Sequence, residues 1–369
     1  MIYFDNAATT YPKPECVYEG INVGMKRYSF NAGRGEYKQS LDTYKMIEQT
    51  RLSVAEVAKT SKENVVFTSS ATEAINNLID SLFNEEDVVL VTPFEHNAVI
   101  RALHARHIKT CIIPFERDTW DINIVDLNNE LVLKKPRGII ISHISNVTGY
   151  ELPYNEIFKL GKKYGTINIL DSAQGFGIYN IVNDFVDFIV FDGHKSLYAT
   201  FGIAGFIKFT NINLKIVKAG GTGSDSLNLE MPMSYPERYE PGSMNSLAIY
   251  SLKCSLAFLK ENKIKAKIKK MTDYLIEQLS KNDRIILYLP SNNQTNGIVS
   301  INVLDYSSNE VAEILNSEYD ICVRSGFHCA PFIHDFIGSK KYNGTVRISL
   351  GYFNTFEEID ELVQALRNL

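Results

Sequence analysis

The sequence has no apolar run that approaches the roughly 20 residues needed to span a bilayer. Its first residues, MIYFDNAATTYPKP, lack the basic start and apolar stretch of a secretory signal. The 38 Lys and Arg residues are outnumbered by 43 Asp and Glu residues, whereas nucleic-acid binding usually shows as a basic excess. These absences predict a soluble cytoplasmic protein that binds neither membrane nor nucleic acid.

Cysteine is scarce and scattered. The chain has five cysteines, none in a C-x-x-C pair and none spaced with histidine as zinc ligands are. Their odd number and the lack of a secretory signal argue against a disulfide framework, and no metal site is expected. A functional cysteine here would act alone, as a nucleophile or redox thiol. The five are Cys16, Cys111, Cys254, Cys322 and Cys329.

The chain also lacks repeats, low-complexity tracts and Pro-rich linkers, and its 369 residues suggest two or three domains. From about residue 64 to residue 209, short apolar runs alternate with helical patterns, which predicts a mostly parallel sheet covered on both faces. The predicted strands are 65–68, 88–92, 110–114, 138–142, 166–170, 185–191 and 205–209. The predicted helices between them are 71–82, 97–107, 126–133 and 153–164.

Beyond about Ser246 the pattern changes to longer helices and shorter strands, which predicts a smaller α+β domain. The predicted helices are 246–261, 263–281, 308–318 and a last one from residue 355. The predicted strands are 285–289, 297–302, 321–323 and 345–350.

Polar side chains gather directly after five of the predicted strands of the larger region. Any single loop of this kind is usually a helix cap, and Ser70 with Glu73 has capping-box spacing. Five in succession are different, because the carboxyl ends of parallel strands meet at one edge of a sheet and ligands bind there. The loops are residues 69–73, 94–97, 145–149, 171–174 and 192–196.

These side chains match the needs of pyridoxal 5′-phosphate. A lysine amine can form a Schiff base, and a buried carboxylate can hold the proton of a pyridinium ring. An imidazole can stack on the ring, amide side chains can bind its phenolic oxygen, and a helix N-terminus can hold a phosphate. The loops contain Lys195, Asp171, His96, Gln174 and Thr72 in positions suited to these tasks.

The chain resembles the fold-type-I pyridoxal-phosphate enzymes of the class V aminotransferase group, and within it the cysteine desulfurase and selenocysteine lyase branch. The matching segments occur in order from residue 4 to residue 355. They are FDNAATTYPKP, NAGRG, TSSATEAIN, FEHN, SNVTG, DSAQ, GHKS, GGTGS, RYEPGSMN, RSGFHCAP and VRISLGYFNT.

The resemblance implies an α/β fold with two domains. A large cofactor-binding domain, residues 15–255, would contain a mostly parallel seven-stranded sheet. A small α+β domain, residues 1–14 and 256–369, would carry the loop of Cys329. A homodimer is implied as well, because Thr222 is expected to reach the cofactor phosphate of the neighbouring subunit.

The resemblance also implies a role for each matching residue. Lys195 would bind the cofactor covalently, Asp171 would pair with its ring nitrogen, and His96 would stack on the ring. The phenolic oxygen would be contacted by Gln174 with Asn146 nearby, and the phosphate by Ala71, Thr72 and His194. The substrate carboxylate would bind Arg347, with Arg324 as a second cation and Asn146 close to it.

For Cys329 the resemblance implies a nucleophile. Arg324 and His328 lie close to it in sequence and are expected to favour its thiolate, whereas the other four cysteines are expected to be buried and inert. The implied reaction converts L-cysteine to L-alanine. Lys195 moves the Cα proton, and Cys329 takes the sulfur as a persulfide, which an acceptor protein or thiol then removes. Selenocysteine is a further candidate substrate.

Two departures from the family pattern leave alternatives open. Asp192 stands where relatives carry a Ser or Thr that donates to the phosphate, and Gly33 stands where they often carry His. One alternative is an aminotransferase, lyase or epimerase of the same group that acts on another amino acid, with Cys329 incidental. Another is a catalytically poor sulfur carrier or regulatory protein, which Asp192 would favour.

Overall fold

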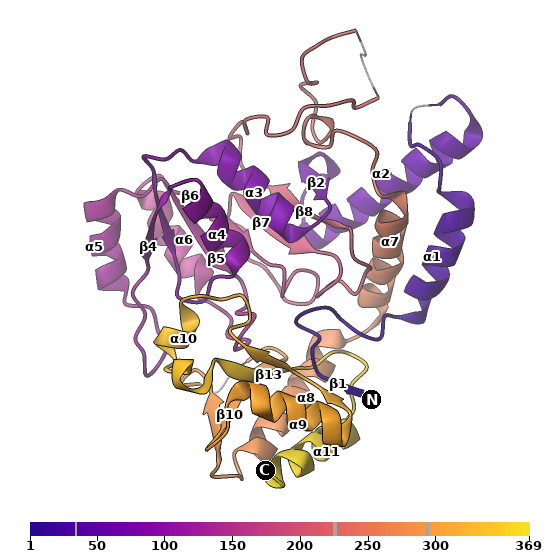
Figure 1. Ribbon diagram of the computed structural model, residues 1–369. Helices are drawn as coiled ribbons and strands as arrows, with labels where there is room; N and C mark the ends of the chain where they lie inside the picture. The colour runs from indigo at the N-terminus through magenta and orange to yellow at the C-terminus, as the bar shows by residue number, and fades with distance from the viewer. Residues whose placement is uncertain (34, 224–226, 293–294) are drawn as a thin grey trace.

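The computed structural model describes every residue except 34, 224–226 and 293–294 (Figure 1). Seven strands form a central sheet in the order β2-β8-β7-β6-β5-β3-β4. Their bounds are β2 Val65–Thr68, β3 Val88–Val91, β4 Lys109–Ile112, β5 Gly138–Ser142, β6 Ile167–Asp171, β7 Phe188–Asp192 and β8 Ala204–Lys208. All seven predicted strands are therefore confirmed, with bounds that shift by at most a few residues.

Six of these strands point the same way, and β8 is reversed. The pairs β3–β4, β3–β5, β5–β6 and β6–β7 are parallel, whereas β8 is antiparallel to both β7 and β2. Because two antiparallel steps restore the direction, β2 runs parallel to β7. The loops after β2, β3, β5, β6 and β7 consequently share one edge of the sheet, as the sequence predicts.

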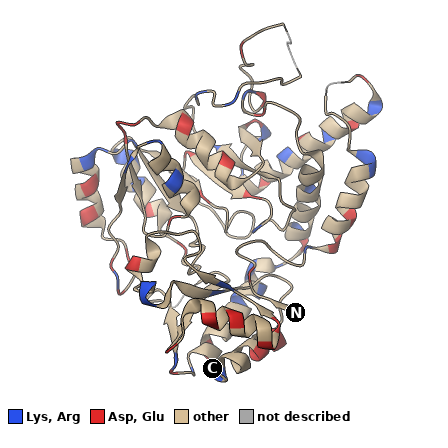
Figure 2. Cartoon of the chain, in the orientation of Figure 1, with Lys and Arg blue, Asp and Glu red and all other residues tan. Residues whose placement is uncertain are grey.

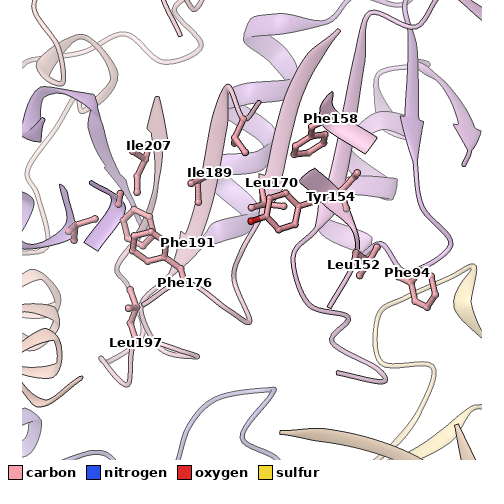
Figure 3. Packing of buried hydrophobic residues seen from close by; sticks show 14 of the residues in the cluster. Phe94, Leu152, Tyr154, Phe158, Leu170, Phe176, Ile189, Phe191, Leu197 and Ile207 are labelled. Carbon is pink, nitrogen blue, oxygen red and sulfur yellow. The ribbon is translucent and has the colours of Figure 1, made fainter. Parts of the chain in front are cut away.

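The central strands are buried on both faces because their apolar side chains alternate between two cores. In β5, Ile139 and Ile141 join one cluster and Ile140 the other. In β7, Ile189 and Phe191 face the first cluster, where Phe191 stacks on Phe176 with ring centroids 5.3 Å apart (Figure 3). This burial explains the continuous apolar runs of the sequence, since no face of these strands meets water.

Helices cover both faces of the sheet (Figure 1). Helices α3 (Ala71–Leu82) and α4 (Asn97–Ala105) bury apolar side chains in one cluster. Helices α5 (Ile124–Lys134) and α6 (Tyr154–Lys163) bury theirs in the other, together with α2 (Lys38–Ala58) and α7 (Ser246–Glu261). Helix α1 (Glu15–Arg27) packs on α7.

A second sheet, in the order β12-β13-β10-β9, forms a smaller α+β part with its own apolar cluster. Its strands are β9 Ile285–Tyr288, β10 Ile298–Val303, β12 Arg324–Gly326 and β13 Thr345–Ser349. Its helices are α8 Ile264–Leu279, α9 Ser308–Tyr319, α10 Ile333–Phe336 and α11 Phe356–Arg367. The N-terminal strand β1 (Ile2–Tyr3) joins this part by pairing in parallel with β11 (Ile321–Cys322).

The predicted domain boundaries remain a prediction. Helix α7 continues across the predicted boundary between residues 255 and 256. The sequence did not predict α1 or α2, and the reason for α2 is visible in its packing. Its buried positions include Ser40, Thr43, Thr50 and Arg51, and these polar side chains interrupt the apolar period.

The outer helices carry Lys and Arg side by side with Asp and Glu (Figure 2). Within the part of the chain that the structure describes, no helix combines the length and apolar character required of a membrane span.

Candidate active site

The five predicted loops surround one cavity at the edge of the central sheet. Its lining combines residues from the loops after β2, β3, β5, β6 and β7, so segments far apart in the sequence meet there. The lining includes Ala71, Thr72, His96, Asn146, Asp171, Gln174, Asp192 and Lys195. Seven of the twelve predicted site residues therefore line this cavity, and an eighth, His194, is next to Lys195 in the chain.

Asp171 is the last residue of β6 and is almost completely buried. Its Oδ1 accepts a hydrogen bond of 3.0 Å from the Ala173 N–H. Burial raises the pKa of this carboxyl above its usual range, and the charge of Lys195 acts in the opposite direction. A cationic partner inside the cavity would therefore stabilise the ionised carboxylate.

His96 is the N-cap residue of α4, and its Nδ1 accepts from the Ala98 N–H at 3.0 Å. Burial lowers the pKa of His96 to about 3, helped by the charges of Lys195, Arg324 and Arg347. The imidazole is consequently neutral at physiological pH and carries its remaining proton on Nε2. A neutral flat ring at this position suits stacking on a heterocycle.

Helix α3 begins at the cavity. Ser70 is its N-cap, and its Oγ accepts from the Glu73 N–H at 3.2 Å. The predicted capping box is only half formed, because Glu73 turns its carboxylate to the Ser69 N–H instead of closing on Ser70. The first amides of α3, including those of Ala71 and Thr72, have no carbonyl partner within the helix, and such amides attract anions.

Asp192, at the end of β7, lies between two basic side chains. Its Oδ2 is 3.3 Å from His194 Nε2 and 3.7 Å from Lys195 Nζ. Lys13, which the sequence analysis did not single out, packs against the same loop, and its Nζ donates to the His194 carbonyl at 2.9 Å. Burial lowers the pKa of Lys13 to about 7.

Arg347 is buried in β13 and already has an acidic partner. Its Nη2 lies 2.6 Å from Asp5 Oδ1, and its Nη1 donates to the Asn146 carbonyl at 3.0 Å. Its Nε is buried with no hydrogen-bond partner. Asp5 is a site residue that sequence reasoning missed. No local signal could have revealed it, because the two residues are 342 positions apart.

The two amide side chains of the predicted site have partners within the protein. Gln174 Nε2 donates to the Ala7 carbonyl at 2.8 Å. Asn146 Nδ2 donates to the His328 carbonyl at 2.8 Å, whereas its buried Oδ1 has no hydrogen-bond partner among the described residues. Asn146 therefore links the sheet edge to the loop of Cys329 and keeps one acceptor for a ligand.

Cys329 is partly exposed and is held next to the cavity. The Arg324 guanidinium approaches its sulfur, with Nη2 3.3 Å from Sγ. The Cys329 carbonyl accepts from the Asn97 N–H at 2.6 Å, directly beside His96. Arg324 is thus the cation next to the thiol, and its predicted role as a second cation for the substrate remains a prediction.

His328 does not supply the positive charge that the sequence analysis expected beside Cys329. Its Nε2 lies 2.9 Å from Thr345 Oγ1, and the residue is buried. Burial lowers the pKa of His328 well below its usual value, so the ring is neutral.

The other four cysteines are only partly buried, which corrects the expectation that they are fully buried. For three of them, Cys16, Cys254 and Cys322, partial burial raises the pKa of the thiol. Because the thiolate is the nucleophile, these three are poor candidates for reactivity.

Thr222 lies outside the cavity of Lys195. It lines a different cavity of about 220 Å³ together with Arg51, Lys62 and Glu240. A third cavity of about 340 Å³, beside Ser69 and Lys218, is larger still. The site is nevertheless assigned to the smaller cavity, because the predicted chemistry-bearing groups converge there. Arg34 of NAGRG and Ser224 of GGTGS lie outside the described residues.

The residues of the cavity fit pyridoxal 5′-phosphate with one exception. A buried carboxylate and a lysine face one space, and a helix N-terminus opens into it. Within the described ranges of the chain, the buried Asn146 Oδ1 and His194 Nδ1 have no hydrogen-bond partners, as expected for groups that bind a polar ligand. The exception is Asp192, an anion close to where a phosphate would bind.

Comparisons with known proteins identify the family of the chain. The family model for aminotransferase class-V matches residues 2–362. A probable cysteine desulfurase of Methanothermobacter thermautotrophicus is 29% identical over 382 aligned residues, which cover the whole of this chain and 94% of that protein. One from Pyrococcus abyssi is 29% identical over 393 aligned residues, covering all of this chain and 96% of its own.

Solved structures show the same fold. The apo structure of a cysteine desulfurase from Thermococcus onnurineus superposes with a TM-score of 0.90 and is 26% identical, covering 100% of this chain and 95% of that one. A cysteine desulfurase from Escherichia coli superposes with a TM-score of 0.84 at 22% identity, covering 99% of this chain and 94% of that one.

Proposed function

Because the chain belongs to the aminotransferase class-V family and is a pyridoxal-phosphate enzyme of that family, we propose that it is a cysteine desulfurase, which converts L-cysteine to L-alanine and transfers the sulfur to Cys329. The observation that carries this proposal is the placement of the thiol. Cys329 Sγ lies 3.3 Å from Arg324 Nη2. The Cys329 carbonyl accepts a hydrogen bond from the Asn97 N–H, which places the residue beside the cavity of Lys195. The names of the relatives support the same activity.

In this proposal Lys195 holds the cofactor, and Asp171 holds the proton of its ring nitrogen. When bound, the cofactor withdraws electrons from the substrate Cα. His96 would stack on the ring, and the first amides of α3 would bind the phosphate. Lys195 Nζ moves the proton from the substrate Cα.

Arg347 is proposed to orient the substrate carboxylate. A guanidinium suits this task because it can form two parallel hydrogen bonds. Asp5 holds one side of it, and the partnerless Nε remains available to the substrate.

Cys329 is proposed to take the sulfur. Arg324 Nη2 lies 3.3 Å from Sγ, so the guanidinium orients the sulfur that attacks the substrate. A bond forms between Sγ and the substrate sulfur as the substrate C–S bond breaks. The persulfide stays on Cys329, and the three-carbon fragment takes up protons and leaves as alanine. Since Cys329 is partly exposed, an acceptor protein or thiol can then reach the persulfide. Selenocysteine would react at the same position.

The proposal includes a homodimer and a cytoplasmic location. Between residues 226 and 234 the described chain exposes three apolar side chains, Leu227, Leu229 and Met233, at 97%, 99% and 79%. Such exposure of apolar side chains is typical of an interaction surface. A second copy would cover this segment, and Thr222 nearby would reach the partner's cofactor phosphate.

The test is the formation of alanine and sulfide from L-cysteine with a reductant present. We expect both products from the wild type. Cys329→Ser should keep the colour of the bound cofactor and form no sulfide. In a separate sample without reductant, the wild type should carry the added mass of one sulfur atom on the peptide that contains residue 329, and Cys329→Ser should not. Cys322→Ser, which removes another partly exposed thiol, should behave as the wild type.

Full desulfurase activity in Cys329→Ser would refute the role of Cys329. Absence of alanine, combined with turnover of another amino acid, would assign the enzyme to a different reaction of the family. Selenocysteine is assayed in parallel.

A further inference from the structure

Asp192 is a buried acidic residue, and the two oxygens of its carboxylate have different surroundings. Its side chain is 6% exposed, and Oδ2 faces His194 and Lys195. The other oxygen, Oδ1, is buried and has no hydrogen-bond partner among the residues that the structure describes. Asp192 also lines the cavity into which the N-terminus of α3 opens at Ala71 and Thr72.

His194 completes the pair. Its Nε2 lies 3.3 Å from Asp192 Oδ2, and its buried Nδ1 has no hydrogen-bond partner within the described part of the chain. Two polar atoms of the pair, Asp192 Oδ1 and His194 Nδ1, therefore make no hydrogen bond to the described residues. Because they interact directly, a proton gained at this position belongs to the pair and not to either residue alone.

The backbone keeps the Asp192 carboxylate beside the cavity. Asp192 pairs with Ala204 in β8, and the next residue donates its Gly193 N–H to the Ile203 carbonyl at 2.9 Å. A side chain at Gly193 would approach the Ile203 carbonyl oxygen to 2.5 Å, so this turn has little freedom to move. Asp192 cannot withdraw from the cavity by a simple shift of the strand end.

The charges that face Asp192 come from several elements. Lys195 and His194 follow it in the same loop, and Lys13 acts on it from the N-terminal segment. Asp171 in β6 and His96 before α4 face it across the cavity. Although burial acts to raise the pKa of Asp192, the hydrogen bond from His194 and the charge of Lys195 outweigh it and lower the pKa below its usual range. Asp192 is therefore ionised while the cations remain close.

A phosphoryl group alters this balance, because it brings up to two negative charges next to an ionised carboxylate. We propose that the Asp192–His194 pair takes up a proton when the cofactor's phosphoryl group binds, so that cofactor affinity falls as pH rises. This inference rests on the proposed cofactor.

The experiment measures the dissociation constant of pyridoxal 5′-phosphate for the wild type, Asp192→Thr and Asp192→Asn at several pH values. At about pH 6 the three proteins should bind alike. At about pH 8.5 both variants should bind about tenfold more tightly than the wild type, the size expected for one unit charge in a partly solvated site. Calorimetry in two buffers of different ionisation enthalpy should show greater proton uptake by the wild type than by Asp192→Thr.

Three comparisons serve as controls. Two of them use other ligands to test whether the phosphate is responsible, and one uses another variant. Pyridoxal, which has the aldehyde without the phosphate, should not show a pH-dependent difference between the three proteins. Asp184→Asn makes the same charge change at an exposed residue before β7 and should bind as the wild type does. Pyridoxamine 5′-phosphate, which cannot form the covalent bond with Lys195, should reproduce the difference seen with pyridoxal 5′-phosphate.

The outcomes are distinguishable from those of the proposed function. Equal affinities of wild type and Asp192→Thr at every pH, with equal proton uptake, would overturn the inference and leave the desulfurase proposal intact. The same pH-dependent difference with pyridoxal would also overturn it, because the phosphate would then play no part. If neither protein binds pyridoxal 5′-phosphate at any pH, both proposals fail.

Discussion

Cys329 illustrates how much of the site is decided at the level of single residues. It and His328 both adopt positive φ angles, 56° and 48°, which cost an ordinary side chain about 1–2 kcal/mol each. Hydrogen bonds from Asn146 to the His328 carbonyl and from Asn97 to the Cys329 carbonyl hold this conformation. The thiol is therefore kept beside the cavity, where Arg324 contacts it.

Glu95 is a second residue of this kind, because its neighbours determine the pKa of its carboxyl group. It is fully buried beside the site, where it accepts hydrogen bonds from Thr92 Oγ1 at 2.6 Å and from Ser142 Oγ at 2.7 Å. Burial raises the pKa of Glu95 from 4.5 to about 7, and these donors oppose the increase only in part. The folded protein thus binds a proton more tightly than the unfolded chain does.

Stability should consequently decrease as pH rises from about 4.5 to about 7, by up to about 3 kcal/mol for this residue. Glu95→Gln cannot ionise and should lose this dependence, although it is less stable at low pH because its amide cannot accept every donor. Urea unfolding at about pH 5.5 and about pH 7.5 measures the difference, with the exposed Glu56→Gln as control. Parallel pH dependence in wild type and Glu95→Gln would contradict the assignment.

At the scale of single elements, helix starts follow local chemistry. Thr355 and Ser307 form complete capping boxes with Glu358 and Glu310, at the starts of α11 and α9. Each pair satisfies amides that the helix itself cannot. At α3 the same spacing yields half a box, because Glu73 also lies close to Lys218 and turns outward to it. Spacing predicts the start of a helix, whereas the surroundings decide how the cap is completed.

Thr355→Ala should lower the free energy of unfolding by about 1 kcal/mol, because the Glu358 N–H loses its acceptor. Thermal or urea unfolding measures the change. Thr355→Ser keeps the hydroxyl and should retain most of the stability. Equal losses in the two variants would show that the methyl group, and not the cap, is responsible.

At the scale of the whole molecule, the N-terminal segment joins the smaller part of the chain to the site. Ile2 and Tyr3 pair with β11, Asp5 holds Arg347, and Thr10 and Lys13 donate to the His194 carbonyl. The first 13 residues therefore contact both the proposed substrate arginine and the proposed cofactor loop. Movement of this segment would disturb both at once.

The exposed apolar segment gives the prediction for the assembly. Leu229→Asp should weaken the proposed dimer at least about tenfold, because it places a charge where an apolar side chain would be covered. Light scattering after size exclusion, at several protein concentrations, measures the mass. Leu133→Asp changes a leucine of α5 that is 74% exposed and should not alter the mass. An unchanged dimer in Leu229→Asp would remove this segment from the interface.

The sequence alone determined the elements of the central sheet and the positions of the loops that carry Lys195, Asp171 and His96. It could do so because apolar runs, helix periods and strand-end loops are local patterns. It did not reveal α2, whose polar buried side chains interrupt the period, or β12, a short strand that contains Gly326 and is completed by pairing with β13.

Only the tertiary structure decided which side chains meet. The direction of β8, the ion pair between Asp5 and Arg347, and the position of Lys13 beside Asp192 depend on segments brought together by packing. The neutral state of His328 has the same origin, since burial beside Thr345 determines it. Local periodicity specifies an element, whereas the charge and partner of a buried side chain depend on distant residues that share its surroundings.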